Sequence, residues 1–189
     1  TGDMLVDDHE VLEEIFQHSP VNIVTHCEDT PMILANEKAA IEEFGDSVDA
    51  TFHAKIRSAE ACLKSSQLAH DLATKHGSNL HILHLTTAEE MKLFTPGDIK
   101  GKNITAEVCV HHLYFNESSY KTLGNQIKCN PSIKTEADQM ALIAAVNANK
   151  IDIIATDHAP HTWDEKQRDY LLAPSAVSYT HLRAHETPE

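Results

Sequence analysis

The sequence predicts an α/β fold in which helices cover a parallel β-sheet. Four short runs of apolar and β-branched residues, typical of buried strands, occur at residues 21–25, 80–85, 104–110 and 151–156. They are apolar at most positions, as expected for strands that are buried on both faces of a parallel sheet. Helical segments alternate with them. A closed barrel and an open doubly wound sheet fit this pattern equally well, but no glycine-rich turn follows any run, which argues against the nucleotide-binding version.

The helical segments are recognised by their periodicity and by the residues at their ends. They cover residues 7–18, 32–44 and 57–76, a short stretch after Thr87, and a stretch from Thr135 through Val146. Thr30 is expected to cap the second segment, and Gly45 and Gly77 are expected to end the second and third. Thr135 and Asp138 have the spacing of a capping box.

Composition restricts the classes of partner and the compartment. The 189 residues include 15 Lys and Arg against 29 Asp and Glu, which gives a net charge of −14 at pH 7. Such a chain repels phosphate backbones and anionic lipid, so neither a nucleic acid nor a membrane is expected as a partner. No apolar run approaches the roughly 18 residues of a spanning helix. Four cysteines without a CxxC motif are typical of a reduced, cytoplasmic protein.

The length fits one domain or a piece of a larger one. Because the chain starts with Thr1 rather than Met, and residues 1–3 resemble the middle of a longer chain, we expect a fragment. Residues 1–175 carry the whole α/β pattern, whereas residues 176–189 show no apolar periodicity and resemble translated sequencing-adapter read-through. We therefore interpret this tail as non-native, and its histidine pair, His181 and His185, as accidental.

Three strand ends carry possible metal ligands. His26 follows the first strand run, His84 lies at the end of the second, and Asp157 follows the fourth. Sites in parallel α/β folds are built at the carboxyl ends of the strands, and adjacent strands lie only ~4.8 Å apart. A single histidine there is more often a hydrogen-bonded structural residue, and a single aspartate is often a helix cap. The occurrence of all three at strand ends favours a shared site.

Five segments of the chain resemble the dihydroorotase family, which are cyclic amidohydrolases of the metal-dependent amidohydrolase superfamily. The matching stretches are THCED at residues 25–29, HILHLTTA at 81–88, AEVCVHHL at 106–113, KCNPSIK at 128–134 and IIATDHAPH at 153–161. The last is the most discriminating, and the others are specific only together. The resemblance covers residues 2–175.

The resemblance implies the second half of a distorted (β/α)8 barrel of the amidohydrolase type, with a site for two Zn²⁺ ions. It implies that His26 and His84 bind one zinc as neutral imidazoles. Asp157 would bind the other zinc and act as the catalytic proton shuttle. The family also uses an HxH pair and a carboxylated lysine. No HxH occurs in residues 1–175, so the remaining ligands are expected upstream of this fragment, which alone should be inactive.

The resemblance also implies how a small-molecule substrate binds. Asn130 would contact the pyrimidine ring, and His161 together with the Ala159 backbone would hold the substrate carboxylate. The implied activity is the interconversion of dihydroorotate and N-carbamoyl-L-aspartate in pyrimidine biosynthesis. A dihydropyrimidinase or allantoinase, which needs no cation for a ring carboxylate, stays open, with His161 as the discriminating residue. A non-catalytic scaffold stays open as well, as does a homo-oligomeric state of the full-length protein.

Several further residues could be mistaken for site residues, and the sequence predicts structural roles for them. Cys27 and His81 are expected to pack away from the site, because strand neighbours alternate between faces. His111 and His112 are adjacent, so we expect one to pack in the core and the other to contact the site or a loop. Arg57 could reach the site, but a salt bridge at a helix start is the expected role.

Glu28 and Asp29 follow His26 directly. These carboxylates could orient the His26 imidazole or could cap the next helix, and the sequence does not decide between the two roles.

Overall fold

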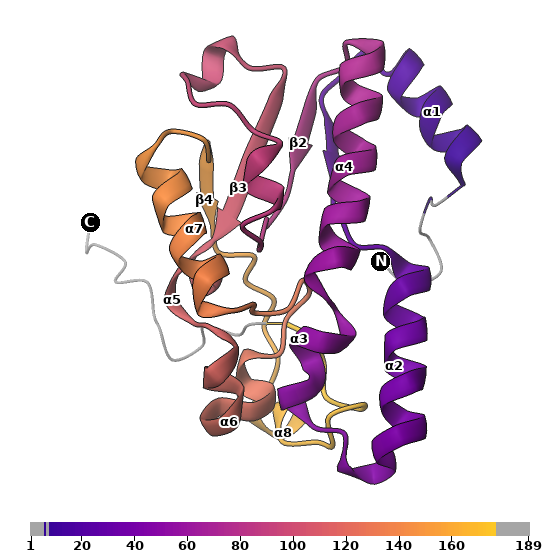
Figure 1. Cartoon of the computed structure of the whole chain (residues 1–189), viewed down its shortest axis with the longest axis vertical. Helices are drawn as coiled ribbons and strands as arrows, with labels where there is room; N and C mark the ends of the chain where they lie inside the picture. Colours follow the sequence, from indigo (N-terminus) through magenta and orange to yellow (C-terminus); the bar gives the residue numbers. More distant parts are fainter. Residues whose placement is uncertain (1–5, 7, 177–189) are drawn as a thin grey trace.

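The computed structural model describes residue 6 and residues 8–176, which form a parallel sheet with helices around it (Figure 1). The strands are β1 (Ile23–Thr25), β2 (Leu80–Ile82), β3 (Ile104–Cys109) and β4 (Ile153–Ala155). All three pairings are parallel, and the strand order is β1-β2-β3-β4. The predicted α/β class with a parallel sheet is confirmed.

The strand order also decides between a barrel and a doubly wound sheet. A doubly wound sheet reverses its strand order at a switch point and carries helices on both faces. Here each strand lies beside its predecessor, and right-handed crossovers in that order place the connecting helices on one face. Figure 1 shows α4 (Ala59–His76) and α7 (Glu136–Asn147) on the same face of the sheet. The arrangement is that of a partial (β/α)8 barrel.

Short helices and 3₁₀ turns complete the described chain. The other α-helices are α1 (His9–His18), α2 (Thr30–Phe44), α3 (His53–Ile56), α5 (Val110–Tyr114), α6 (Tyr120–Leu123) and α8 (Trp163–Lys166). The 3₁₀ turns are Gly45–Ser47, Ala50–Phe52, Glu90–Lys92, Ile99–Gly101, Glu117–Ser119 and Gly124–Ile127. Figure 1 shows α2, α3, α6 and α8 gathered beyond the carboxyl ends of the strands.

Side chains at the helix ends explain where the predicted boundaries shift. Asp29, rather than Thr30, caps α2, because its carboxylate accepts the Met32 N–H at 2.9 Å. The helix predicted from residue 57 starts only after Ser58, whose hydroxyl accepts the Ala61 N–H. The capping box at the start of α7 is confirmed.

Several predicted elements are shorter than expected, including the strands β1, β2 and β4, which occupy only Ile23–Thr25, Leu80–Ile82 and Ile153–Ala155. The helix after Thr87 is only the 3₁₀ turn Glu90–Lys92, because the Glu90 carboxylate accepts the Thr87 N–H and holds the chain in a tight turn. The strand predicted at residues 104–110 ends at Cys109, since Val110 already begins α5.

The two faces of the sheet differ in chemistry, so the prediction of strands that are apolar on both faces is wrong. On β3, Ala106 and Val108 are fully buried in the core that the helices cover. The alternate residues Thr105 and Glu107 both contact the His81 side chain of β2. Because successive strand residues point to opposite faces, β3 separates an apolar helix side from a polar side. The polar side leads to the strand ends.

Burial falls from the centre of the sheet to its edges. Leu80 and Ile82 of β2 are 0% exposed, whereas Val24 of β1 is 55% exposed and Ile154 of β4 is 53% exposed. A second apolar cluster, which includes Ile56, Tyr120 and Tyr170, packs among the helices beyond the strand ends. The open edges lie where a complete barrel would continue its sheet.

The described part of the chain holds no helix with the length and apolar character needed to cross a bilayer. At its end, Ala176 is buried, and its carbonyl accepts a hydrogen bond from Lys166 Nζ at 2.7 Å. His181, His185 and the rest of residues 177–189 lie outside the described residues, so the interpretation of residues 176–189 as a non-native tail stays a prediction.

Candidate functional site

The two predicted histidine ligands face each other at the ends of β1 and β2. The Nδ1 atom of His26 lies 2.9 Å from the Nε2 atom of His84, and the ring centroids are 4.7 Å apart. Two imidazoles on one tetrahedral zinc ion would place their nitrogens ~3.3 Å apart, so only a small adjustment is needed to seat an ion. Burial lowers the pKa of His84 to about 3, which keeps this imidazole neutral. Neutral imidazole is the state that binds metals.

Glu28 fixes the orientation of the His26 ring. Its carboxylate lies 3.0 Å from His26 Nε2 and forms an ion pair with Arg57 at 2.6 Å. Burial raises the pKa of Glu28, but the hydrogen bond from His26 and the Arg57 charge outweigh it and lower that pKa to about 2. An ionised carboxylate can only accept, so His26 Nε2 donates to Glu28, and Nδ1 is the nitrogen that faces His84. This is the carboxylate–histidine arrangement of metal sites.

These contacts resolve the open question about the two carboxylates. Glu28 orients His26, whereas Asp29 caps α2. Arg57 lies between α3 and the Ser58 cap of α4, and its salt bridge with Glu28 brings it to the site.

Asp157 follows β4 and shares this edge of the sheet, because all four strands are parallel. Burial and the nearby Glu107 carboxylate raise the pKa of Asp157, while His26 opposes the shift. Both neighbours therefore lie within electrostatic reach of its carboxylate. Asp157 has φ 45° and His84 has φ 35°, a left-handed conformation that side chains other than glycine rarely adopt. Such strain, of about 1–3 kcal/mol for each residue, gathers at functional sites.

Glu107 belongs to this site but was missed in the sequence. It comes from β3, is 8% exposed, and accepts the His84 backbone N–H at 3.3 Å. His81, expected to be structural, is buried and contacts the same carboxylate at 3.3 Å. A charged residue within an otherwise apolar strand run was the sequence feature that could have indicated Glu107.

The predicted substrate contacts lie on two loops of the same end. Asn130 follows Cys129 in the loop before α7, and its Oδ1 atom is buried without a hydrogen-bond partner in the described residues. Ala159 and His161 follow Asp157 in the loop after β4. His161 Nδ1 lies 3.4 Å from the Glu165 carboxylate of α8. These positions leave the predicted roles of the loop residues as predictions.

Cys27 is 4% exposed and lies in the core, as expected. His111 and His112 lie on helix α5, and His112 contacts the Pro131 carbonyl oxygen of a loop at 3.1 Å. Their ring centroids are 4.1 Å apart, and both side chains are buried. The Cys109 Sγ atom, one ring nitrogen of His111 and one of His112 all lie within 4.8 Å of one another.

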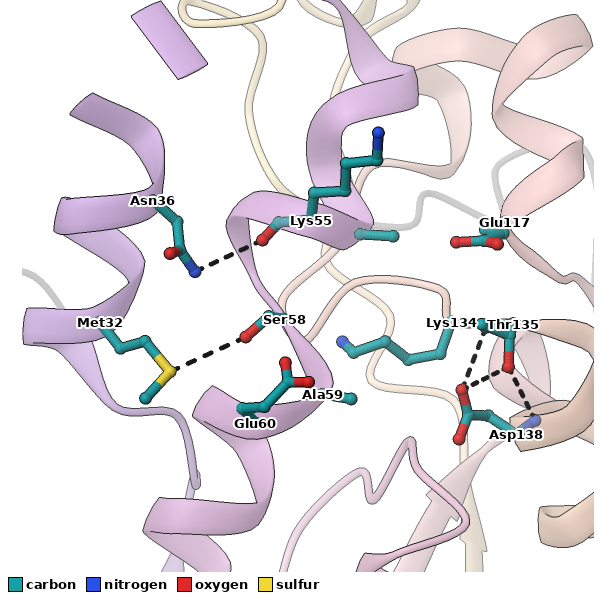
Figure 2. A pocket seen from close by; sticks show the side chains of 11 residues that line it. Met32, Asn36, Lys55, Ser58, Ala59, Glu60, Glu117, Lys134, Thr135 and Asp138 are labelled. Carbon is teal, nitrogen blue, oxygen red and sulfur yellow. Dashed lines mark hydrogen bonds between the residues drawn. The ribbon is translucent and has the colours of Figure 1, made fainter. Parts of the chain in front are cut away.

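A cavity of about 570 Å³ lies elsewhere, between α2, the α3–α4 junction and the start of α7 (Figure 2). Its polar side chains already serve local structure. Asn36 donates to the Lys55 carbonyl, and Asp138 accepts from Thr135. None of the predicted site residues lines this cavity. The volume of a cavity therefore does not locate the catalytic residues here. We place the candidate site at the strand ends.

Solved structures define the class of fold. D-hydantoinase (dihydropyrimidinase) from Thermus sp. has a TM-score of 0.79 at 16% identity over 92% of this chain and 39% of that chain. L-hydantoinase (dihydropyrimidinase) from Arthrobacter aurescens has a TM-score of 0.82 at 21% identity over 93% of this chain and 40% of its own. At such identities the likeness shows the fold alone, which is part of an amidohydrolase-type (β/α)8 barrel.

Sequence relatives are more similar to this chain than those solved structures, and three of them are dihydroorotases. The chain is 34% identical to the dihydroorotase of Bacillus licheniformis over 160 residues, and 32% identical to that of Bacillus subtilis. It is 41% identical to the dihydroorotase of Deinococcus radiodurans over 106 residues, which are 56% of this chain and 26% of that protein. No family model matches the chain. The resemblance to dihydroorotases is thus confirmed.

Both Bacillus alignments cover 82% of this chain but only 35% of the relative. The chain therefore spans about a third of the length of these proteins.

Proposed function

We propose that the protein containing this chain is a dihydroorotase. It would interconvert dihydroorotate and N-carbamoyl-L-aspartate, a step of pyrimidine biosynthesis, by hydrolysing and forming a cyclic amide. The observation that carries the proposal is the pair of facing nitrogens on His26 and His84, 2.9 Å apart, in a chain similar to dihydroorotases. The four buried, unpaired cysteines support a cytoplasmic location. The oligomeric state is left open, a homo-oligomer included.

The donor set fits zinc. His26 and His84 offer one neutral nitrogen each, and Asp157 offers a carboxylate, which are ligand types that zinc prefers. We propose that the two histidines hold one ion and that Asp157 holds the second. Two zinc ions, when bound, lower the pKa of water and polarise the ring carbonyl.

Asp157 would move the proton. Burial and Glu107 raise the pKa of this carboxyl towards the range in which it can both take and give a proton. It would accept the proton of the attacking water and pass it to the departing ring nitrogen. Glu28 keeps His26 in a single tautomer throughout.

The loop residues would select the substrate. The unpartnered Oδ1 of Asn130 can accept a ring N–H of the pyrimidine. His161 and the backbone N–H of Ala159 would bind the carboxylate that distinguishes dihydroorotate from uracil-type rings. The Glu165 carboxylate lies 3.4 Å from His161 Nδ1 and can orient this ring.

The test compares two variants in the full-length protein. Asp157→Ala should nearly abolish turnover and lower the zinc content. His161→Ala should retain zinc and lose roughly 1.5–3 kcal/mol of binding to dihydroorotate, about 10- to 150-fold in kcat/KM. The exposed His18→Ala on α1 is the matched control and should change neither property. Loss of zinc in His161→Ala would make it a ligand and remove the substrate assignment.

The second candidate is a dihydropyrimidinase, the activity named for the two solved structures whose fold this chain shares. Dihydrouracil lacks the ring carboxylate, so His161→Ala would then leave its turnover unchanged. The ratio of dihydroorotate to dihydrouracil turnover separates these two activities. A protein that binds no zinc and turns over neither ring would instead be a non-catalytic scaffold.

A further inference from the structure

A second group of possible metal ligands lies next to the strand-end histidines. Cys109 ends β3, and His111 and His112 follow it on α5. The Cys109 Sγ atom and one nitrogen of each ring all lie within 4.8 Å of one another. The three side chains are 0%, 2% and 3% exposed. None of them is among the ligands proposed for the catalytic zinc ions.

The hydrogen bond of His112 leaves one nitrogen available. Its Nε2 atom lies 3.1 Å from the Pro131 carbonyl oxygen, which can only accept, so Nε2 carries the proton. The lone pair of the neutral ring therefore lies on Nδ1. That atom is buried and has no hydrogen-bond partner in the described residues. A histidine that donates one N–H to a backbone carbonyl and directs its other nitrogen to an ion is the usual arrangement in metal sites.

The protonation states suit a cation. Burial lowers the pKa of His111 to about 4 and holds the pKa of His112 well below its usual value, so both rings stay neutral. Burial, Asp157 and Glu107 raise the pKa of the Cys109 thiol. The two carboxylates thus place negative charge near the sulfur, and a divalent cation is attracted by that charge and displaces the thiol proton.

We propose that Cys109, His111 and His112 form a second metal site, which binds Zn²⁺ or a similar borderline-soft divalent ion through one thiolate and two imidazoles. This ligand set suits zinc, and three protein ligands leave a fourth position of the tetrahedron for another group. The site depends on the geometry of this chain and does not depend on the dihydroorotase activity.

Cobalt substitution separates this site from the catalytic one. The full-length protein is stripped of metal and titrated with Co²⁺ while near-ultraviolet absorption is recorded. A thiolate bound to Co²⁺ gives a charge-transfer band there, whereas a site of histidines and carboxylates gives none. We expect the band in the wild-type protein, its loss in Cys109→Ser and in Cys109→Ala, and a weakened band in His112→Gln.

Matched controls make the result specific. Cys62→Ser changes another fully buried thiol, on α4, and should leave the band unchanged. His26→Ala should lose activity but keep the band, so failure of the proposed function and failure of this proposal are distinguishable. Far-ultraviolet circular dichroism checks that each variant is folded. A wild-type protein without the band, or a folded Cys109 variant that keeps it, would overturn the proposal.

Discussion

Two buried polar groups that lie six residues apart in the sequence, His84 and Glu90, differ in whether their polar atoms are hydrogen-bonded. The Glu90 carboxylate, 2% exposed, accepts hydrogen bonds from the Ser66 hydroxyl, the Thr86 N–H, and both the N–H and hydroxyl of Thr87. At the strand ends, in contrast, His84 Nδ1 is buried without a hydrogen-bond partner among the described residues. A fully bonded carboxylate stabilises a fold, whereas an unbonded buried atom costs free energy unless a ligand satisfies it.

The same contrast holds across the described residues. Of the five buried side-chain atoms without a partner, three lie at the carboxyl end of the sheet, on His84, His112 and Asn130. The left-handed backbone of His84 and Asp157 adds strain there. The rest of the fold must therefore offset the free-energy cost of this strain and of the unbonded buried atoms. This is the usual situation at an active site.

The largest effect is expected when the satisfied cluster is broken. Glu90→Ala leaves buried donors on Ser66, Thr86 and Thr87 without an acceptor. We expect a loss of about 3–5 kcal/mol in the free energy of unfolding, measured by urea denaturation. The neighbouring Glu89→Ala is the control: it removes an exposed ion pair with Lys92 and should change stability by less than about 0.5 kcal/mol. Equal losses in the two variants would contradict the structural role of Glu90.

The next largest effect is expected in the pH dependence of stability, and it depends on a second buried side chain that is fully hydrogen-bonded, His53. His53 is buried between the Tyr170 hydroxyl at 2.7 Å and the Cys129 carbonyl at 2.8 Å. Burial lowers its pKa from 6.5 to about 3. Below pH 6.5 the unfolded chain takes up a proton that the folded chain refuses, so stability falls as the pH falls. Between pH 6.5 and 4.5 this group should contribute a loss of about 2–3 kcal/mol.

Urea denaturation at several pH values measures this contribution. His53→Phe loses two hydrogen bonds and should be less stable at neutral pH, but its stability should depend less steeply on pH than that of the wild-type protein. Parallel pH profiles in the two proteins would show that His53 is not the titrating group.

Much of the fold could be predicted because it is encoded locally. Periodicity located all four strands, and the Thr135–Asp138 spacing located the start of α7. The choice between a barrel and an open sheet could not be made from these patterns, since it depends on strand order. Strand order is a property of contacts between segments that are distant in sequence.

The candidate site was predicted in part for the same reason. His26 and His84 could be found because strand ends are visible in the sequence. Glu107 and Cys109 were missed, because only the register of β3 shows which of its residues share the polar face. The boundary before His111 and His112 was misplaced because the strand was expected to continue to residue 110, where the structure begins a helix.

The smallest effect on stability, and the sharpest test of the comparison, is expected at Asn130. Its Oδ1 makes no hydrogen bond to the described residues, so Asn130→Ala should not lower the free energy of unfolding. If a substrate N–H satisfies this atom, the KM for dihydroorotate should rise by about 3- to 10-fold, the cost of one neutral hydrogen bond.

Asn125 is the matched control for this experiment. Its Oδ1 is also buried without a partner in the described residues, but its Nδ2 donates to the Arg168 carbonyl at 2.8 Å. Asn125→Ala should therefore lower stability and leave KM unchanged, the reverse of the Asn130 result. Steady-state kinetics gives the KM, and urea denaturation gives the free energy of unfolding, for each of the two variants. If both variants raised KM alike, a buried atom without a partner would not mark contact with the substrate, and the distinction between the two clusters would lose its functional meaning.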